Sequence, residues 1–107
     1  MSGETVDSIL GGSLRLIQPR RGYRFSVDAI ALGRFIKPRP GARILELGAG
    51  CGVIAIVAAS LYAPRDVAAV EIQDELAGLI ARNAALNNLS MVRAVAADLR
   101  ARSITAV

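Results

Sequence analysis

Three glycines at alternate positions mark the stretch of the chain with the clearest capacity for chemistry. Residues 43–52 read R-I-L-E-L-G-A-G-C-G, which predicts a short buried strand that runs directly into Gly48, Gly50 and Gly52. An apolar helix pattern begins at Val53. Such a turn brings backbone N–H groups and a helix N-terminus to the carboxyl end of a strand, where a ligand can approach without meeting side chains. The stretch therefore predicts a cofactor-binding loop.

The spacing of the glycines bears on which cofactor this loop would bind. The dinucleotide fingerprint G-x-G-x-x-G, counted from Gly48, requires a glycine at position 53, but Val53 stands there and the glycine is Gly52. With Glu46 before the first glycine, the loop resembles the first motif of class I S-adenosylmethionine-dependent methyltransferases, an acid followed by G-x-G-x-G. On spacing alone, a dinucleotide-binding domain and a glycine turn without a ligand remain alternatives.

Two further acids stand where later strands are expected to end. Residues 67–72 predict a second buried strand that ends at Glu71, followed by a helix over 74–88. An acid at this position can accept hydrogen bonds from both ribose hydroxyls in methyltransferases and in NAD domains alike. A third strand is predicted over 91–98 and ends at Asp98, which is also a candidate N-cap for a following helix.

The segment before the loop combines turn chemistry with basic residues. Residues 11–25 predict a hairpin that turns at Pro-Arg-Arg-Gly, 19–22. Four arginines gather there beside Tyr23: Arg15, Arg20, Arg21 and Arg24. This combination can grip a nucleic-acid backbone and stack a base, although a tyrosine in a hairpin also commonly covers a core edge. A helix over 26–36 follows, with Ser26 as N-cap, Asp28 in its first turn and apolar residues toward the sheet.

Composition limits the classes of function. The chain has 107 residues, which allows one domain, and a formal net charge of +4. That charge is compatible with a polyanionic partner and equally with a solvated surface. A single cysteine, Cys51, excludes an internal disulfide, and without histidine a metal site is hard to assemble. The beginning of the chain does not resemble a secretory signal, and the longest apolar run is too short for a membrane, so we expect a cytoplasmic protein.

Three segments taken together strengthen the family resemblance. Their order is L-R-L-I-Q-P, then G-Y-R-F-S-V-D-A-I-A-L, then R-I-L-E-L-G-A-G-C-G. This order resembles the bacterial tRNA adenine-N6 methyltransferases that modify an adenine beside the anticodon of a valine tRNA, over about residues 10–99. The resemblance implies S-adenosyl-L-methionine as cofactor and tRNA as substrate. The implied cofactor-binding residues are Asp28, Glu46, Gly48, Gly50, Gly52, Glu71, Ile72, Asp98 and Leu99, and the implied substrate contacts are Arg20, Arg21, Tyr23 and Arg24.

The resemblance also predicts an architecture. It implies an α/β, Rossmann-like class I methyltransferase fold, of which this chain would hold the amino-terminal half, with parallel strands in the spatial order three, two, one. Residues 1–41 would form a hairpin and helix extension, and residues 42–107 the incomplete cofactor-binding half of the domain.

Catalysis in the resembled family depends on a later N-P-P-Y segment, and this sequence contains no Asn-Pro pair. We therefore expect the 107-residue chain to be inactive by itself. We also expect it to self-associate through an unpaired strand edge. The alternatives are an NAD-binding oxidoreductase domain and a non-catalytic adenosine- or RNA-binding remnant.

Overall fold

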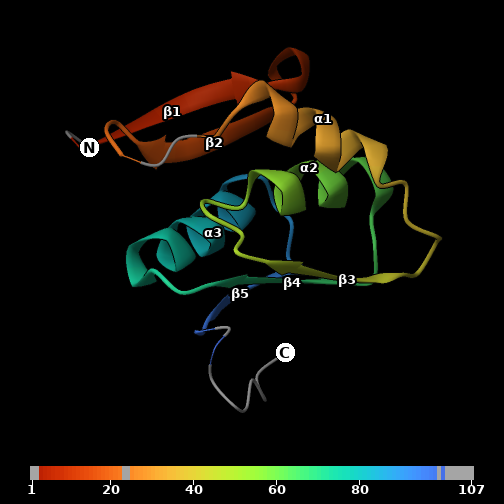
Figure 1. The fold of residues 1–107 in the computed structure, drawn as a ribbon. Coiled ribbons are helices and arrows are strands. Elements are labelled where there is room, and N and C mark those ends of the chain that lie inside the picture. Colours follow the sequence, from red (N-terminus) through yellow and green to blue (C-terminus); the bar gives the residue numbers. More distant parts are fainter. Residues whose placement is uncertain (1–2, 23–24, 99, 101–107) are drawn as a thin grey trace.

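Three layers make up the fold in the computed structural model, which describes residues 3–22, 25–98 and 100 (Figure 1). A two-stranded hairpin and helix α1 form one outer layer, helices α2 and α3 the middle layer, and a three-stranded sheet the other outer layer. The elements are β1 (Glu4–Ile9), η1 (Leu10–Gly12), β2 (Leu14–Pro19), α1 (Val27–Phe35), β3 (Arg43–Leu47), α2 (Val53–Tyr62), β4 (Asp66–Glu71), α3 (Asp74–Leu86) and β5 (Val92–Ala96).

The large sheet is parallel and has the order β3-β4-β5. Leu47 pairs with Val70, and Glu71 pairs with Ala96, so the three strands end at the same edge. Helices α2 and α3 both lie on one face of this sheet (Figure 1). The predicted spatial order three, two, one is confirmed, and the carboxyl edge is where a doubly wound sheet binds its ligand. The proposed division of the chain between residues 41 and 42 stays a prediction.

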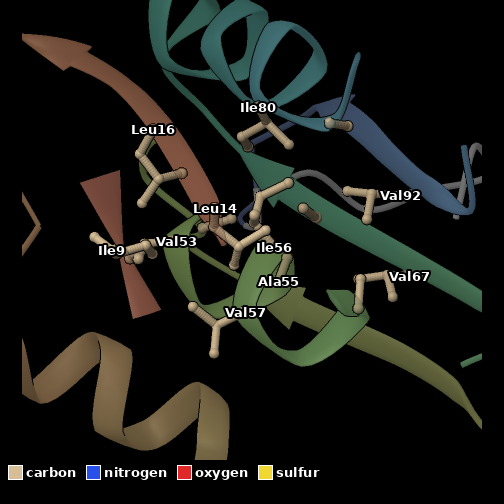
Figure 2. Close-up of a cluster of buried hydrophobic side chains, with 14 residues drawn as sticks. Ile9, Leu14, Leu16, Val53, Ala55, Ile56, Val57, Val67, Ile80 and Val92 are labelled. Carbon is tan, nitrogen blue, oxygen red and sulfur yellow. The ribbon is translucent and has the colours of Figure 1, made fainter. Parts of the chain in front are cut away.

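Helix α2 is apolar all round because it is packed on both sides. Every side chain from Ala55 to Ala59 is buried. Figure 2 shows Ile56 between Leu14 of β2 and Val67 of β4. A helix that is buried on both sides needs no polar face, which explains the unbroken apolar run over residues 53–59. None of the helices in the described part of the chain has the length and apolar character needed to span a bilayer.

The predicted hairpin over 11–25 is wrong in its placement. Strand β2 pairs with β1, in the register Ile9 with Leu14 and Glu4 with Pro19, and the turn is η1. Gly11 and Gly12 have φ values of 64° and 90°, which residues with side chains rarely adopt, so the turn forms there. The buried face of β2 is Leu14, Leu16 and Gln18. Tyr23 and Arg24 lie outside the described residues.

The strand predicted over 43–47 is confirmed, but it is only half buried. Ile44 packs against the core, whereas Leu45 and Leu47 are 53% and 57% exposed. Strand β4 is the one neighbour of β3 in the described sheet, and the described helices all lie on one side of this sheet (Figure 1). Ile44 packs against the core and alternate side chains of a strand point to opposite faces, so Leu45 and Leu47 lie on the face of β3 that the described helices do not cover.

Helix α1 begins after Ser26 as predicted, but its apolar residues do not face the sheet. Ser26 Oγ accepts a hydrogen bond from the Ala29 N–H at 3.3 Å. The helix packs on α2 instead, and Phe35 stays 78% exposed. The contact is made at Gly33, where an added Cβ would lie 2.8 Å from Cβ of Val57. The missing side chain at Gly33 is what allows the two helices to approach.

Two helix glycines should respond oppositely to alanine. Alanine raises helix propensity by about 1 kcal/mol over glycine, and an added Cβ at Gly78 of α3 meets nothing within 4 Å. We expect Gly78→Ala to raise the free energy of unfolding by up to about 1 kcal/mol. At Gly33 the steric overlap of the new Cβ with Val57 outweighs the gain in helix propensity. We therefore expect Gly33→Ala to lower the free energy of unfolding by about 1–2 kcal/mol. Urea denaturation of both variants checks this, and a stabilising Gly33→Ala would contradict the packing.

The open edge of β3 should make the isolated chain self-associate. Unpaired backbone groups beside exposed leucines are a template for strand pairing, and a lysine on such a strand opposes it. We expect a concentration-dependent mass above that of the 11.2 kDa monomer in light scattering, reduced by Leu45→Lys. The matched control is Val27→Lys, which charges a 79% exposed apolar residue on α1. A monomer at all concentrations, or equal effects of both lysines, would refute pairing through β3.

Candidate cofactor-binding site

The glycine loop between β3 and α2 depends on backbone conformations that glycine adopts easily. Gly48, Gly50 and Gly52 have φ values of 68°, 60° and 90°. Gly52 is also the N-cap of α2, and a Cβ there would lie 3.1 Å from Cγ1 of Ile80. At Gly48 an added Cβ would meet nothing within 4 Å, so the space beside the loop is open. The predicted strand, glycine loop and helix are thus all present.

Glu71, at the end of β4, holds the loop in place. Its side chain is buried, with the residue 5% exposed. One carboxylate oxygen accepts a hydrogen bond from the Gly50 N–H at 2.8 Å, and the other accepts one from the Gln73 N–H at 3.0 Å. A carboxylate has about four acceptor positions, so both oxygens keep capacity for further donors. Glu71 therefore shapes the loop and still has acceptor sites for a ligand.

Glu46, in β3, is a buried acid near the first turn of α2, where Gly52 supplies no side-chain cap. Burial raises the pKa of Glu46 to about 7, and the nearby Ala55 N–H opposes the rise. Its Oε1 is buried without a hydrogen-bond partner in the described part of the chain. The helix N-terminus favours the charged form of this acid, but burial opposes that form more strongly, so the net effect favours the protonated form.

Folding stability should depend on pH through Glu46. The folded chain holds this proton to a higher pH than the unfolded chain, so the stabilisation is complete below the ordinary pKa of 4.5 and is lost as pH rises through about 7. We expect the free energy of unfolding to fall by up to about 3 kcal/mol from about pH 5 to about pH 8. Glu46→Gln should abolish most of this fall in urea titrations. The control Glu75→Gln, at an exposed site, should keep it.

The remaining cofactor candidates lie along the same sheet edge, with one exception. Ile72 follows β4 directly and is 52% exposed. Asp98 follows β5 by two residues, and the Ala97 N–H between them donates to the Glu71 carbonyl at 3.1 Å. The Arg100 guanidinium, assisted by the Arg100 N–H at 2.9 Å, lowers the pKa of Asp98. Leu99, and the helix predicted after Asp98, lie outside the described residues.

Asp28 is the exception because α1 lies in the layer that packs on the far side of α2 (Figure 1). It is exposed in the first turn of that helix. Its placement beside the cofactor stays a prediction.

The end of the hairpin reaches the same side of the molecule as the loop. Pro19, at the end of β2, lines one cavity together with Asp74 and Glu75 at the start of α3. Glu4 of β1 forms an ion pair with Arg82 of α3 at 2.7 Å. Arg20 and Arg21 follow Pro19 directly and are exposed. Two of the predicted substrate contacts therefore lie near the carboxyl edge of the sheet.

Two asparagines of α3, Asn83 and Asn87, fix that hairpin. Asn83 is fully buried; its Oδ1 accepts from the Ile17 N–H at 2.6 Å, and its Nδ2 donates to the Ile17 carbonyl at 2.9 Å and the Cys51 carbonyl at 3.0 Å. One turn later, Asn87 makes the same pair of bonds with Arg15, at 3.0 Å and 2.7 Å. The sequence carries a signal for this, an N-x-x-x-N spacing on one helix face. Asn83 shares a helix face with Leu76, Leu79 and Ile80, so apolar periodicity assigns it to the core and does not indicate its partners.

Cys51 is a free cysteine buried inside the loop. Within residues 3–22, 25–98 and 100, no three cysteine, aspartate or glutamate side chains gather as a set of metal ligands.

Comparison with known proteins gives one family match. A protein-family model described as "Lysine methyltransferase" matches residues 33–100. No curated protein sequence matches the chain.

Several solved structures share the fold. TYW2 from M. jannaschii in complex with AdoMet has a TM-score of 0.77 and 23% identity, covering 90% of this chain and 44% of that chain. The M. jannaschii tRNA m1G37 methyltransferase has a TM-score of 0.76 and 19% identity, covering 95% of this chain and 32% of that chain. TrmN from Thermus thermophilus has 38% identity and a TM-score of 0.58, covering 65% of this chain and 21% of that chain.

The two TM-scores above 0.7 come with identities below 25%, so those likenesses show the fold, and the present chain spans less than half the length of each of the three structures. The family match covers most of the sequence and includes the glycine loop, Glu71 and Asp98. It favours a methyltransferase over the dinucleotide-binding alternative. The chain therefore belongs to the methyltransferase family described as "Lysine methyltransferase", and it has the Rossmann-like fold of the class I S-adenosylmethionine-dependent methyltransferases.

Proposed function

We propose that this chain binds S-adenosyl-L-methionine at the glycine loop and serves methyl transfer to an adenine amino group of tRNA. The observation that carries the proposal is the hydrogen bond from the Gly50 N–H to buried Glu71, because it joins loop and acid in one rigid cradle. A cytoplasmic location accompanies this proposal, since tRNA is its substrate.

The residues present fit the cofactor. Open space beside Gly48 would admit its methionine part, and the free acceptor positions of Glu71 would take the two ribose hydroxyls. Asp98 would accept from the adenine amino group, while Ile72 and Leu99 would pack on the ring. When bound, the sulfonium supplies a methyl group on an already activated leaving group. This chain's own part is to orient that group and exclude water, since positioning can carry much of such catalysis.

The basic hairpin supports a nucleic-acid substrate. Arg20 and Arg21 are exposed near the carboxyl edge of the sheet, and the formal charge of the chain is +4. The 38% identity with TrmN from Thermus thermophilus also supports a nucleic-acid substrate. The adenine target and a contribution from Tyr23 and Arg24 rest on the sequence resemblance. Because that resemblance puts the catalytic N-P-P-Y in a segment absent from this sequence, we expect binding by the chain without turnover.

A second candidate follows from the family description. "Lysine methyltransferase" favours a protein lysine as the methyl acceptor. The cofactor site would be the same in both cases, so the hairpin decides between them. RNA binding depends on cation contacts with phosphates, and the exposed Arg20 and Arg21 of the hairpin can supply such contacts.

Ligand binding tests the proposal. In calorimetry we expect the chain to bind S-adenosylmethionine or S-adenosylhomocysteine and to bind NAD more weakly or not at all. Unmodified tRNA should also bind. We expect Arg21→Ala to lower the affinity for tRNA. The same substitution should reduce the magnitude of the slope of log K against log salt concentration by about 0.7–0.9. The control is Arg65→Ala, an exposed arginine before β4 at the opposite edge of the sheet.

Two outcomes would count against the proposal, and a third would contradict only the absence of turnover expected of this chain. Tighter NAD binding would favour an oxidoreductase domain. Methylation of protein lysine without tRNA binding would favour the second candidate. Methyl transfer to tRNA by the 107-residue chain would contradict the expected loss of turnover.

The two ligand-facing acids should contribute unequally. Glu71 can accept from two ribose hydroxyls and also holds the loop through Gly50, whereas Asp98 would accept one bond and is engaged by Arg100. Hydrogen bonds to a charged group are worth about 1.5–3 kcal/mol each. We expect Glu71→Ala to weaken S-adenosylhomocysteine binding more than Asp98→Ala in calorimetry, with Glu75→Ala as the control. Equal or reversed losses would contradict the ribose assignment.

A further inference from the structure

One buried side chain contacts both the glycine loop and the hairpin. The Nδ2 group of Asn83 donates to the carbonyl of Cys51, between the second and third glycines of the loop, and to the carbonyl of Ile17 in β2. Its Oδ1 accepts from the Ile17 N–H at 2.6 Å. The residue has no exposed surface, so water does not compete for these bonds.

The loop is held on both sides of the bond to Asn83. The N–H of Gly50 is bound by Glu71, and Gly52 lies close against Ile80. The orientation of the Cys51 peptide, which lies between these two residues, is therefore set by its neighbours in the loop. A ligand on this loop would further restrict that peptide and keep its carbonyl aligned with the amide of Asn83.

The other partner of Asn83 lies just before the basic end of the hairpin. Ile17 packs against Cys51, Leu76 and Leu79. Arg20 and Arg21 follow it by three and four residues. The orientation of β2 at Ile17 thus sets the direction in which the chain presents these arginines.

Asn87 provides a natural comparison. It binds Arg15 of the same strand edge with the same pair of amide bonds. Its third bond is to the Asn83 carbonyl within α3, and the glycine loop is not among its partners in the described part of the chain. Loss of Asn87 therefore loosens the hairpin without touching the loop.

We infer that Asn83 is a positioning residue that couples cofactor binding at the glycine loop to RNA binding at the hairpin. The inference rests on the proposed function and adds a linkage between its two ligands. Linkage is reciprocal, so the cofactor must raise RNA affinity by the factor by which RNA raises cofactor affinity. Measured couplings of this kind are typically about 5–150-fold.

The experiment measures this factor in the full 107-residue chain with S-adenosylhomocysteine and an unmodified tRNA transcript. In the wild type we expect each ligand to raise the affinity for the other by at least about fivefold. Asn83→Ala should bind each ligand separately but reduce the factor to within about twofold of unity. Asn87→Ala should keep the wild-type factor. If Asn83 had only a structural role, both variants would lose stability but would show the same coupling factor.

A measurement on the wild type covers the case in which Asn83→Ala does not fold. S-adenosylhomocysteine should slow amide hydrogen exchange at Ile17, whose N–H binds Asn83, by at least about fivefold. Exchange at Arg15, whose N–H binds Asn87, should change by less than about twofold. Equal slowing at both amides, or none, would overturn the inference.

The other outcomes separate the inference from the function on which it rests. A wild type that binds both ligands with no coupling overturns the inference and leaves the proposed function standing. Loss of coupling in Asn87→Ala as large as in Asn83→Ala also overturns it. A wild type that binds neither ligand overturns the proposed function, and the inference with it.

Discussion

The hydrogen bond between the Gly50 N–H and Glu71 is the interaction on which the site depends. A chain that passes from strand to helix in a few residues needs positive φ values, and these select glycine. Glycine has no side chain to hold such a turn, so other elements must hold it. Here β4 supplies Glu71, and α3 supplies Asn83 and Ile80. The loop is short, but its shape is a property of the whole layered core.

Most of the β-α-β part of the fold could be predicted from the sequence because its signals are local. The strand over 43–47, the helix from Val53 and the helix from Asp74 follow from apolar periodicity and from glycines or acids at their ends. The hairpin could not be placed in this way. The sequence E-T-V-D-S-I of β1 is a weak strand signal, and Pro19–Gly22 offered a competing turn. The choice was decided by burial of Leu14 and Leu16 against α2, which no local pattern reports.

The candidate site also has some features that local sequence patterns predict and others that they do not. Glu71 and Asp98 were predictable because an acid directly after a buried strand has a defined place at the sheet edge. The bonds of Asn83 were not, because their partners are backbone groups of segments distant in sequence. The type of a side chain shows whether it can donate or accept a hydrogen bond, but only the fold determines which group is its partner. Asn83 shows this best, since it occupies a helix position that periodicity assigns to the core.

The attachment of the hairpin to α3 has a consequence for the order of folding. Strands β1 and β2 are neighbours in sequence and can pair early, yet the two asparagines that secure β2 lie 66 and 72 residues further along the chain. Contacts of such separation form late, because the closure entropy of a long loop must be overcome first. During synthesis the hairpin leaves the ribosome well before α3. Its apolar face, with Leu14 and Leu16, must therefore stay uncovered until α2 and α3 have emerged, so β2 is secured only after elements that follow it in the sequence.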